Sequence, residues 1–206
     1  MKALFIIFSA CLLSACTSLI TPTVEKEIPK LDGGDYKIDP DHSRVIFKVG
    51  HLGLSQYVGR FNQFDARLTF NPDKPEETVL QATVDTISID VADDDFEESL
   101  SGSTWLDSQD FPQAYFASDS IQLTGKNTDD KQQAKFCGVL TLINVTKPLC
   151  FDVTFNGGAF NMLSASYTLG FEARAQFKRS DFGMDAYIPA VSDEVELEIH
   201  AEFVKL

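Results

Sequence analysis

The chain lacks the short motifs that mark common metal, redox and hydrolase sites. No Cys-x-x-Cys pair occurs, which argues against a zinc ribbon and against a thioredoxin-type redox centre. No Gly-x-Ser-x-Gly segment occurs, so a serine hydrolase is not indicated. The only three histidines, His42, His51 and His200, have no spacing that supports a zinc site. We therefore expect no catalytic residues, no metal site and no enzyme activity.

Positive charge is also scarce. Lys and Arg total 17 against 31 Asp and Glu, and the formal net charge is -14. A surface of this sign repels phosphate backbones, so we expect no nucleic-acid partner. The acidic run at residues 90–98 lacks the mid-loop glycine and the closing glutamate of a calcium-binding EF-hand loop. We interpret this run as the solvated start of a helix.

The apolar run at residues 3–13 is too short for a membrane span of about 20 residues. It follows Lys2 and precedes the small residues Ser14 and Ala15, which is the pattern of a secretory signal. The sequence thus predicts a signal peptide over residues 1–15 and an exported chain.

The signal ends in Leu-Ser-Ala-Cys, which resembles a bacterial lipobox whose Cys16 is acylated and becomes the new N-terminus. The alternative is ordinary cleavage near Ala15, with Cys16 incidental. Thr17, rather than Asp, follows the cysteine, and in this position the chain resembles lipoproteins that are sorted to the outer membrane. We expect a cell-envelope protein that faces the periplasm and reaches the membrane through an acyl anchor on Cys16.

Residues 16–34 are predicted to form a lipidated tether, and residues 35–206 a single domain. The tether segment is mostly polar, contains Pro22 and Pro29, ends at Gly33-Gly34 and shows no sustained period. Fully extended, its 18 residues after Cys16 reach at most about 60 Å.

The domain shows a hydrophobic period of two. In residues 165–177 the odd positions are apolar while most even positions are polar, and residues 195–203 repeat this pattern. Such alternation is typical of strands with one dry face and one wet face. The sequence predicts about eight antiparallel strands, which lie at residues 36–49, 57–70, 79–91, 114–123, 134–142, 149–156, 165–177 and 195–203.

The alternation breaks at residues 94–100, where Phe96 and Leu100 share one helical face. We expect a short helix there and a second turn near residues 104–110. Together these elements predict an all-β fold, an eight-stranded antiparallel barrel with one or two short helices. A solid sandwich would use the same strands, and composition does not separate the two.

Several short segments, in a fixed order, carry a resemblance to a known family. They are Tyr36-Lys37-Ile38-Asp39, His42-Ser43, Gly59 with Phe61, Trp105-Leu106-Asp107, Gly138-Val139-Leu140-Thr141-Leu142, Val145-Thr146-Lys147-Pro148, Arg179-Ser180-Asp181-Phe182-Gly183-Met184 and Val191-Ser192-Asp193-Glu194-Val195. Taken together, they resemble the YceI-like family over residues 35–205.

The resemblance implies a lipocalin-like barrel with a long apolar channel that holds a polyisoprenoid or a similar amphipathic lipid. It implies no shared catalytic centre and no cofactor other than that lipid. Two departures from the family pattern stand out. Asn144 replaces a common turn glycine but tolerates a left-handed backbone. Ser99 precedes Leu100 where the family often has His, so a ligand contact of that histidine is not carried over.

The heavy load of 17 Phe supplies candidate lining residues. Phe61 and Phe64 differ in phase, so both point inward only if a bulge intervenes. Ala173 and Ala175 would leave room between larger neighbours. We expect the lipid to contact Phe47, Val49, Phe61, Phe64, Phe70, Tyr167, Leu169, Phe171, Ala173, Ala175 and Phe177.

A packed core uses the same residue types, so two functions remain open. One is an envelope lipoprotein that binds an amphipathic lipid in an apolar barrel channel. The other is a structural or interaction protein of the envelope whose barrel is filled by side chains.

Cys137 and Cys150 remain as a candidate disulfide, since an exported chain permits one. Both lie on the outward face of adjacent predicted strands. A two-residue turn at Ile143-Asn144 places them directly opposite each other. A turn at residues 145–146 instead separates them beyond the roughly 7 Å between Cα atoms that a bridge requires.

Overall fold

The computed structural model describes residues 22–206, so the predicted signal peptide and Cys16 lie outside the described residues. Strands dominate this part of the chain, with one α-helix and several short 3-10 helices. The elements are η1 (Ile28–Lys30), β1 (Gly34–Ile38), β2 (Arg44–His51), β3 (Ser55–Phe61), β4 (Phe64–Phe70), η2 (Pro75–Glu77), β5 (Val79–Asp85), η3 (Thr86–Ser88), β6 (Ile89–Asp90), α2 (Asp94–Ser101), β7 (Gln113–Lys126), β8 (Gln132–Leu142), β9 (Val145–Asn161), β10 (Ser166–Lys178), η4 (Arg179–Phe182) and β11 (Val191–Lys205).

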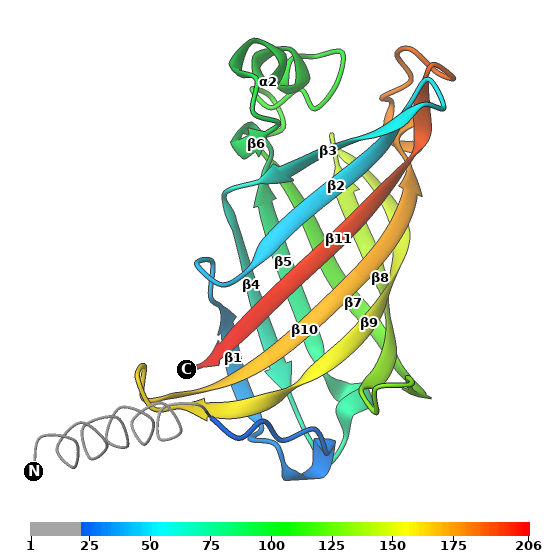
Figure 1. Cartoon of the computed structure of the whole chain (residues 1–206). Helices are drawn as coiled ribbons and strands as arrows, with labels where there is room; N and C mark the ends of the chain where they lie inside the picture. Colours follow the sequence, from blue (N-terminus) through cyan, green and yellow to red (C-terminus); the bar gives the residue numbers. More distant parts are fainter. Residues whose placement is uncertain (1–21) are drawn as a thin grey trace, which may run out of the picture.

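Eight strands close into an antiparallel barrel, which confirms the predicted fold. Their order around the ring is β1-β4-β5-β7-β8-β9-β10-β11, and β11 returns to β1 where Tyr36 pairs with Lys205. The other half of β11 pairs with β2, which carries β3 and β6 in turn. These three strands therefore build the wall at the end of the barrel where α2 lies (Figure 1).

Three of the strands predicted from the sequence are divided in the structure. The stretch 36–49 becomes β1 and β2 because a turn intervenes, in which Asp39 Oδ1 accepts the Asp41 N–H at 3.0 Å and Pro40 has no N–H to give to a ladder. The stretch 57–70 is divided at residues 62–63, and the stretch 79–91 by η3. Residues 22–206 therefore contain eleven strands where the sequence predicts about eight, and eight of the eleven close the barrel.

The acidic run begins a helix, as predicted. Asp93 is the N-cap of α2, and its carboxylate accepts the Phe96 N–H at 3.1 Å. Glu97 reaches back to accept the N–H groups of Val91 and Asp93. Turns at residues 103–106 and 108–110 follow, where a second turn was predicted.

The hairpin of β8 and β9 adopts the first of the two predicted registers. Ile143 and Asn144 have φ values of 49° and 56°, the left-handed conformation that a two-residue type I′ turn requires. Cys137 pairs with Cys150 across the hairpin, and a disulfide joins them with a Cα–Cα distance of 4.0 Å.

One end of the barrel is closed by packed side chains. Its cluster contains the fully buried Tyr36 and Leu169, together with Leu31 from outside the barrel. Leu31 follows η1, where it and Ile28 lie one helical turn apart and pack against the same cluster.

The second half of the predicted tether is therefore part of the barrel. The N–H and C=O of Glu25 each form a 2.8 Å hydrogen bond with Gly158 on β9. Gly157 beside it has φ of +130°, and a Cβ there would lie 2.2 Å from a Val24 methyl group, so only glycine leaves room for this segment. Any free tether is confined to the residues before this Glu25–Gly158 clamp.

Candidate functional site

The barrel encloses a cavity of about 720 Å³, a volume within the usual range for small-molecule sites. Its walls are almost entirely aliphatic and aromatic side chains from the inward faces of the strands. The closed-end cluster seals it below, and residues of α2 and of the loop after η4 border it above. The molecule thus holds an apolar chamber, and the residues at its α2 end, which we call the mouth, include polar side chains such as Ser99, Trp105 and Arg179.

Seven of the predicted lining residues border this cavity, namely Phe47, Val49, Phe61, Phe64, Phe171, Ala173 and Phe177. Phe61 and Phe64 both face it because the chain leaves β3 and starts β4 between them, with residues 62–63 outside either strand. A break between two strands, and not a bulge, therefore allows both side chains to face the cavity.

The other four predicted lining residues do not border the cavity. Phe70, Tyr167 and Leu169 pack in the closed end, where facing side chains meet and leave no open channel. Ala175 is 6% exposed and belongs to the main core, opposite Leu197 on β11. These four lie on the predicted face of their strands, but side chains fill the space in front of them, apart from a separate small pocket of about 40 Å³ beside Phe70.

The helix α2 contributes the wall at the mouth. Phe96 and Leu100, four residues apart on one helical face, both line the cavity together with Ser99. The Phe96 ring meets Tyr57 of β3 edge-on at 5.4 Å between centroids. The helix is thereby held against the rim by the residues that the sequence marked as its apolar side.

A buried arginine organises the opposite side of the mouth. Arg179 begins η4, is 2% exposed and borders the cavity. Its Nε donates to the Ser192 carbonyl at 2.8 Å and its Nη1 to the Met184 carbonyl at 2.6 Å. Its Nη2 donates to the carbonyls of Ala186 and Val191 at 2.8 and 3.0 Å. Burial lowers the pKa of this guanidinium from its ordinary value.

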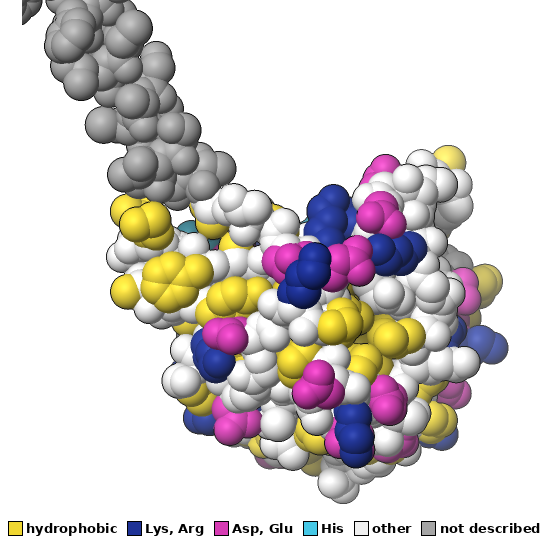
Figure 2. Space-filling model, turned by 90° about the horizontal axis from the view of Figure 1, so that it is seen from below, with side chains coloured by type: hydrophobic (Ala, Val, Ile, Leu, Met, Phe, Trp, Pro, Cys, Tyr) yellow, Lys and Arg dark blue, Asp and Glu magenta, His cyan; other side chains and the backbone are white. Residues whose placement is uncertain are grey.

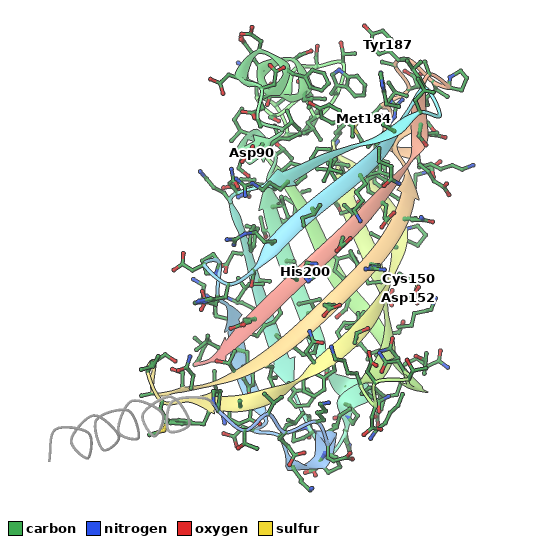
Figure 3. All side chains as sticks on the ribbon, in the orientation of Figure 1. Asp90, Cys150, Asp152, Met184, Tyr187 and His200 are labelled. Atoms are coloured by element: carbon green, nitrogen blue, oxygen red, sulfur yellow. A yellow bond between two sulfur atoms is a disulfide. The ribbon has the colours of Figure 1, made fainter. Side chains whose placement is uncertain are left out.

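Two aromatic rings continue from Arg179 across the mouth. Trp105 lies under the guanidinium at 5.2 Å and stacks on Tyr187 at 6.1 Å between centroids. Met184 and Tyr187 lie at the α2 end of the molecule (Figure 3). Arg179 therefore fixes the conformation of the 183–191 loop and sets the position of these rings at the rim.

A carboxylate supports the same loop. Asp193 accepts the Ser180 N–H at 3.0 Å and the Ser180 hydroxyl at 2.9 Å. The hydrogen bond from the Ser180 backbone N–H is the main reason that the pKa of Asp193 lies below its usual range.

The histidines contribute little to this cavity. His51 borders the mouth and is exposed, whereas His200 lies halfway along β11 with Nε2 at 3.0 Å from Glu198 (Figure 3). Asp39, His42 and Glu202 bring three potential metal-ligand atoms within 4.8 Å of one another on the surface. Asp39 and His42 already pair there at 2.9 Å, away from the cavity.

Sequence reasoning missed the walls supplied by β5, β7, β8 and β9, among them Ala82, Phe116, Phe136 and Phe151. Their inward alternation was present in the sequence and would have identified them. It also missed the lining role of Arg179, since a buried cation that binds only carbonyl groups leaves no pattern of paired charges.

A closed antiparallel barrel with an internal apolar chamber and a helix at its mouth defines the class of lipocalin-like barrels. The chain belongs to the YceI-like family, whose model, described as the YceI-like domain, matches residues 36–203. It is 36% identical to a UPF0312 protein of Pseudomonas fluorescens over 173 residues, which are 83% of this chain and 87% of that protein.

Solved structures show the same fold. BcnA of Burkholderia cenocepacia aligns with a TM-score of 0.71 and 25% identity, over 80% of this chain and 98% of that one. A structure reported as a polyisoprenoid binding domain from Saccharophagus degradans aligns with a TM-score of 0.61 and 13% identity, over 83% of this chain and 98% of that one.

None of the helices in the described part of the chain is long and apolar enough to cross a bilayer.

Proposed function

We propose that this protein binds a polyisoprenoid or a similar amphipathic lipid inside its barrel and carries it in the bacterial cell envelope. The observation that carries this proposal is the enclosed apolar cavity of about 720 Å³. The YceI-like family membership supports it, as does the shared fold of the polyisoprenoid binding domain.

The distribution of polar groups indicates how such a lipid lies. Inside, the walls offer side chains such as Phe136, Phe151 and Ile199, which suit a hydrocarbon chain. Indole, phenol and guanidinium groups border the cavity only near the mouth, so a polar head group belongs there. Burying about ten methylene-sized groups would contribute about 8 kcal/mol, enough for micromolar binding.

The alternative, a structural envelope protein with a side-chain-filled barrel, requires a solid interior. Protein interiors pack at crystal-like density, with few voids larger than a water molecule. A chamber of about 720 Å³ is far larger than such voids and favours the carrier.

The test is extraction of lipid from the full-length protein purified from bacterial envelopes, followed by mass spectrometry of the extract. We expect close to one lipid molecule per barrel, with a long unsaturated or branched chain. An extract with no lipid, from protein that also fails to bind added polyprenols, would refute the carrier function and leave the structural one.

We propose further that the carrier is an outer-membrane lipoprotein anchored at Cys16, which the Leu-Ser-Ala-Cys ending of the signal supports. Replacing Cys16→Ser should move the protein from the membrane fraction to the soluble periplasmic fraction. The intact mass of the wild-type N-terminus should show the acyl groups, and an unmodified mass would refute the anchor.

A further inference from the structure

The end of the β9–β10 hairpin exposes large apolar side chains at the closed end of the barrel. Phe160, Met162 and Leu163 are 54%, 62% and 79% exposed. Val24 lies at the adjoining end of the same strands, against Gly157, and is also exposed. Figure 2, which views this end, shows hydrophobic side chains gathered on one side of it. We call these four residues the apolar tip.

Three of the four residues of the apolar tip, Phe160, Met162 and Leu163, belong to a stretch without charge, whereas Val24 is followed by the charged residues 25–27. Residues 153–171 contain no Asp, Glu, Lys or Arg, although 23% of the whole chain is charged. A surface with net charge -14 is repelled by anionic lipid head groups, but this hairpin is not. The hairpin part of the tip is neutral, exposed and partly aromatic, so it suits contact with a lipid surface.

The chain enters the barrel beside this tip. The Glu25–Gly158 clamp fixes the entry point on β9, and Gly158 lies on the strand that leads to Phe160. Nine residue steps separate Cys16 from Glu25, so an acyl anchor on Cys16 lies at most about 30 Å from the clamp.

That reach is shorter than the barrel. The fifteen residues of β11 run from the mouth to the closed end, which corresponds to about 35 Å along the axis of a barrel with tilted strands. If the barrel stood on its mouth, the clamp would lie about 35 Å above the bilayer, beyond the anchor's reach.

From these observations we propose that the closed end rests on the bilayer that holds the Cys16 anchor, with the apolar tip in contact with the lipid and the mouth directed away. This proposal rests on the anchor proposed above. The lipid therefore enters and leaves the barrel on the side remote from the anchoring membrane, so exchange requires a second surface or a partner at the mouth.

The mouth has an apolar turn of its own, which makes a matched control. Leu54 lies in the turn between β2 and β3 and is 84% exposed, much like Leu163. Leu52 beside it is held by a 2.7 Å hydrogen bond from its N–H to the Ala190 carbonyl of the mouth loop. The two exposed leucines thus occupy hairpin turns at opposite ends of the barrel.

The experiment compares Leu163→Cys with Leu54→Cys in the full acylated protein, each labelled with an environment-sensitive fluorophore. Since Cys137 and Cys150 are joined in a disulfide, the introduced thiol is the intended labelling site. The proteins are incorporated into vesicles of phosphatidylethanolamine and phosphatidylglycerol, with or without lipids that carry a nitroxide quencher. We expect at least a twofold loss of fluorescence at position 163 and no change at position 54.

Quenching at position 54, at both positions or at neither would overturn the proposed orientation. The same samples are analysed for acylation by intact mass and for cavity lipid by extraction. An unacylated N-terminus would overturn the anchor and this orientation together. Acylated, lipid-loaded protein with the wrong quenching pattern would overturn the orientation alone and leave the carrier function in place.

Discussion

Two alanines on one strand lie in different surroundings, one beside the cavity and one in the core. The same substitution should therefore reduce lipid binding at the first and stability at the second. Ala173 and Ala175 lie two residues apart on the inward face of β10. Ala173 borders the cavity, whereas Ala175 is buried in the core and does not. Ala173→Phe therefore adds a ring to empty space, and Ala175→Phe adds the same ring to filled space.

The magnitudes follow from this difference. The new ring of Ala173→Phe should displace about four methylene groups of a bound chain, which costs about 3 kcal/mol of binding, or roughly a hundredfold in Kd. Its own burial should leave the stability of the lipid-free barrel unchanged or slightly raised. Ala175→Phe overpacks the core at a cost of about 1–3 kcal/mol and lowers Tm by roughly 2–4 °C for each kcal/mol.

The assay measures both variants and the wild type in parallel. Lipid content is determined by extraction and mass spectrometry, and Tm is measured on delipidated protein. We expect Ala173→Phe to lose lipid and keep its Tm, and Ala175→Phe to lose Tm. Unchanged lipid content in a folded Ala173→Phe variant would refute the assignment of this wall to the ligand. A large fall in its Tm would show that the space beside Ala173 is already filled.

Three further predictions concern stability. Arg179→Met should lower the free energy of unfolding by more than about 3 kcal/mol in urea titrations, because four carbonyls lose a donor. Arg179→Lys should restore only part of that stability. A full rescue by Lys would argue against the importance of the four hydrogen bonds from Arg179 to these carbonyls. Replacing both Cys137 and Cys150 by Ser should lower the free energy of unfolding by about 3 kcal/mol, as a loop closed over 13 residues implies. In the wild type without reductant, neither cysteine should react as a free thiol. Equal stability of the wild type with and without reductant would contradict this prediction. Hydrogen bonds, first of all from Lys48, lower the pKa of Glu198 to about 2, so its contribution to stability is complete above its unfolded value near 4.5 and is lost as pH falls toward 2. Glu198→Gln should thus be less stable than wild type at pH 7 and equal to it near pH 2, and a difference that persists at low pH would show another origin.

Local patterns along the chain were sufficient to predict the class of fold and the side of each strand that faces inward. Alternation in residues 165–177 assigns Ala173 and Ala175 to the same face, because successive side chains of a strand point to opposite sides. The acidic cap before Phe96 placed the helix, and the ordered motifs identified the family. These are local properties, which neighbouring residues along the chain suffice to specify.

Local patterns could not predict where the inward face borders empty space, because that depends on contacts between distant strands. Ala173 lines the cavity and Ala175 does not, because the answer depends on side chains that other strands bring to the same level of the barrel. The burial of Leu31 depends in the same way on segments distant in sequence, because Leu31 packs against side chains of β1, β4, β9, β10 and β11. The alternation along a strand determines the side to which each side chain points, but closure of the barrel determines which side chains it meets. Whether a cavity remains depends on those neighbouring side chains.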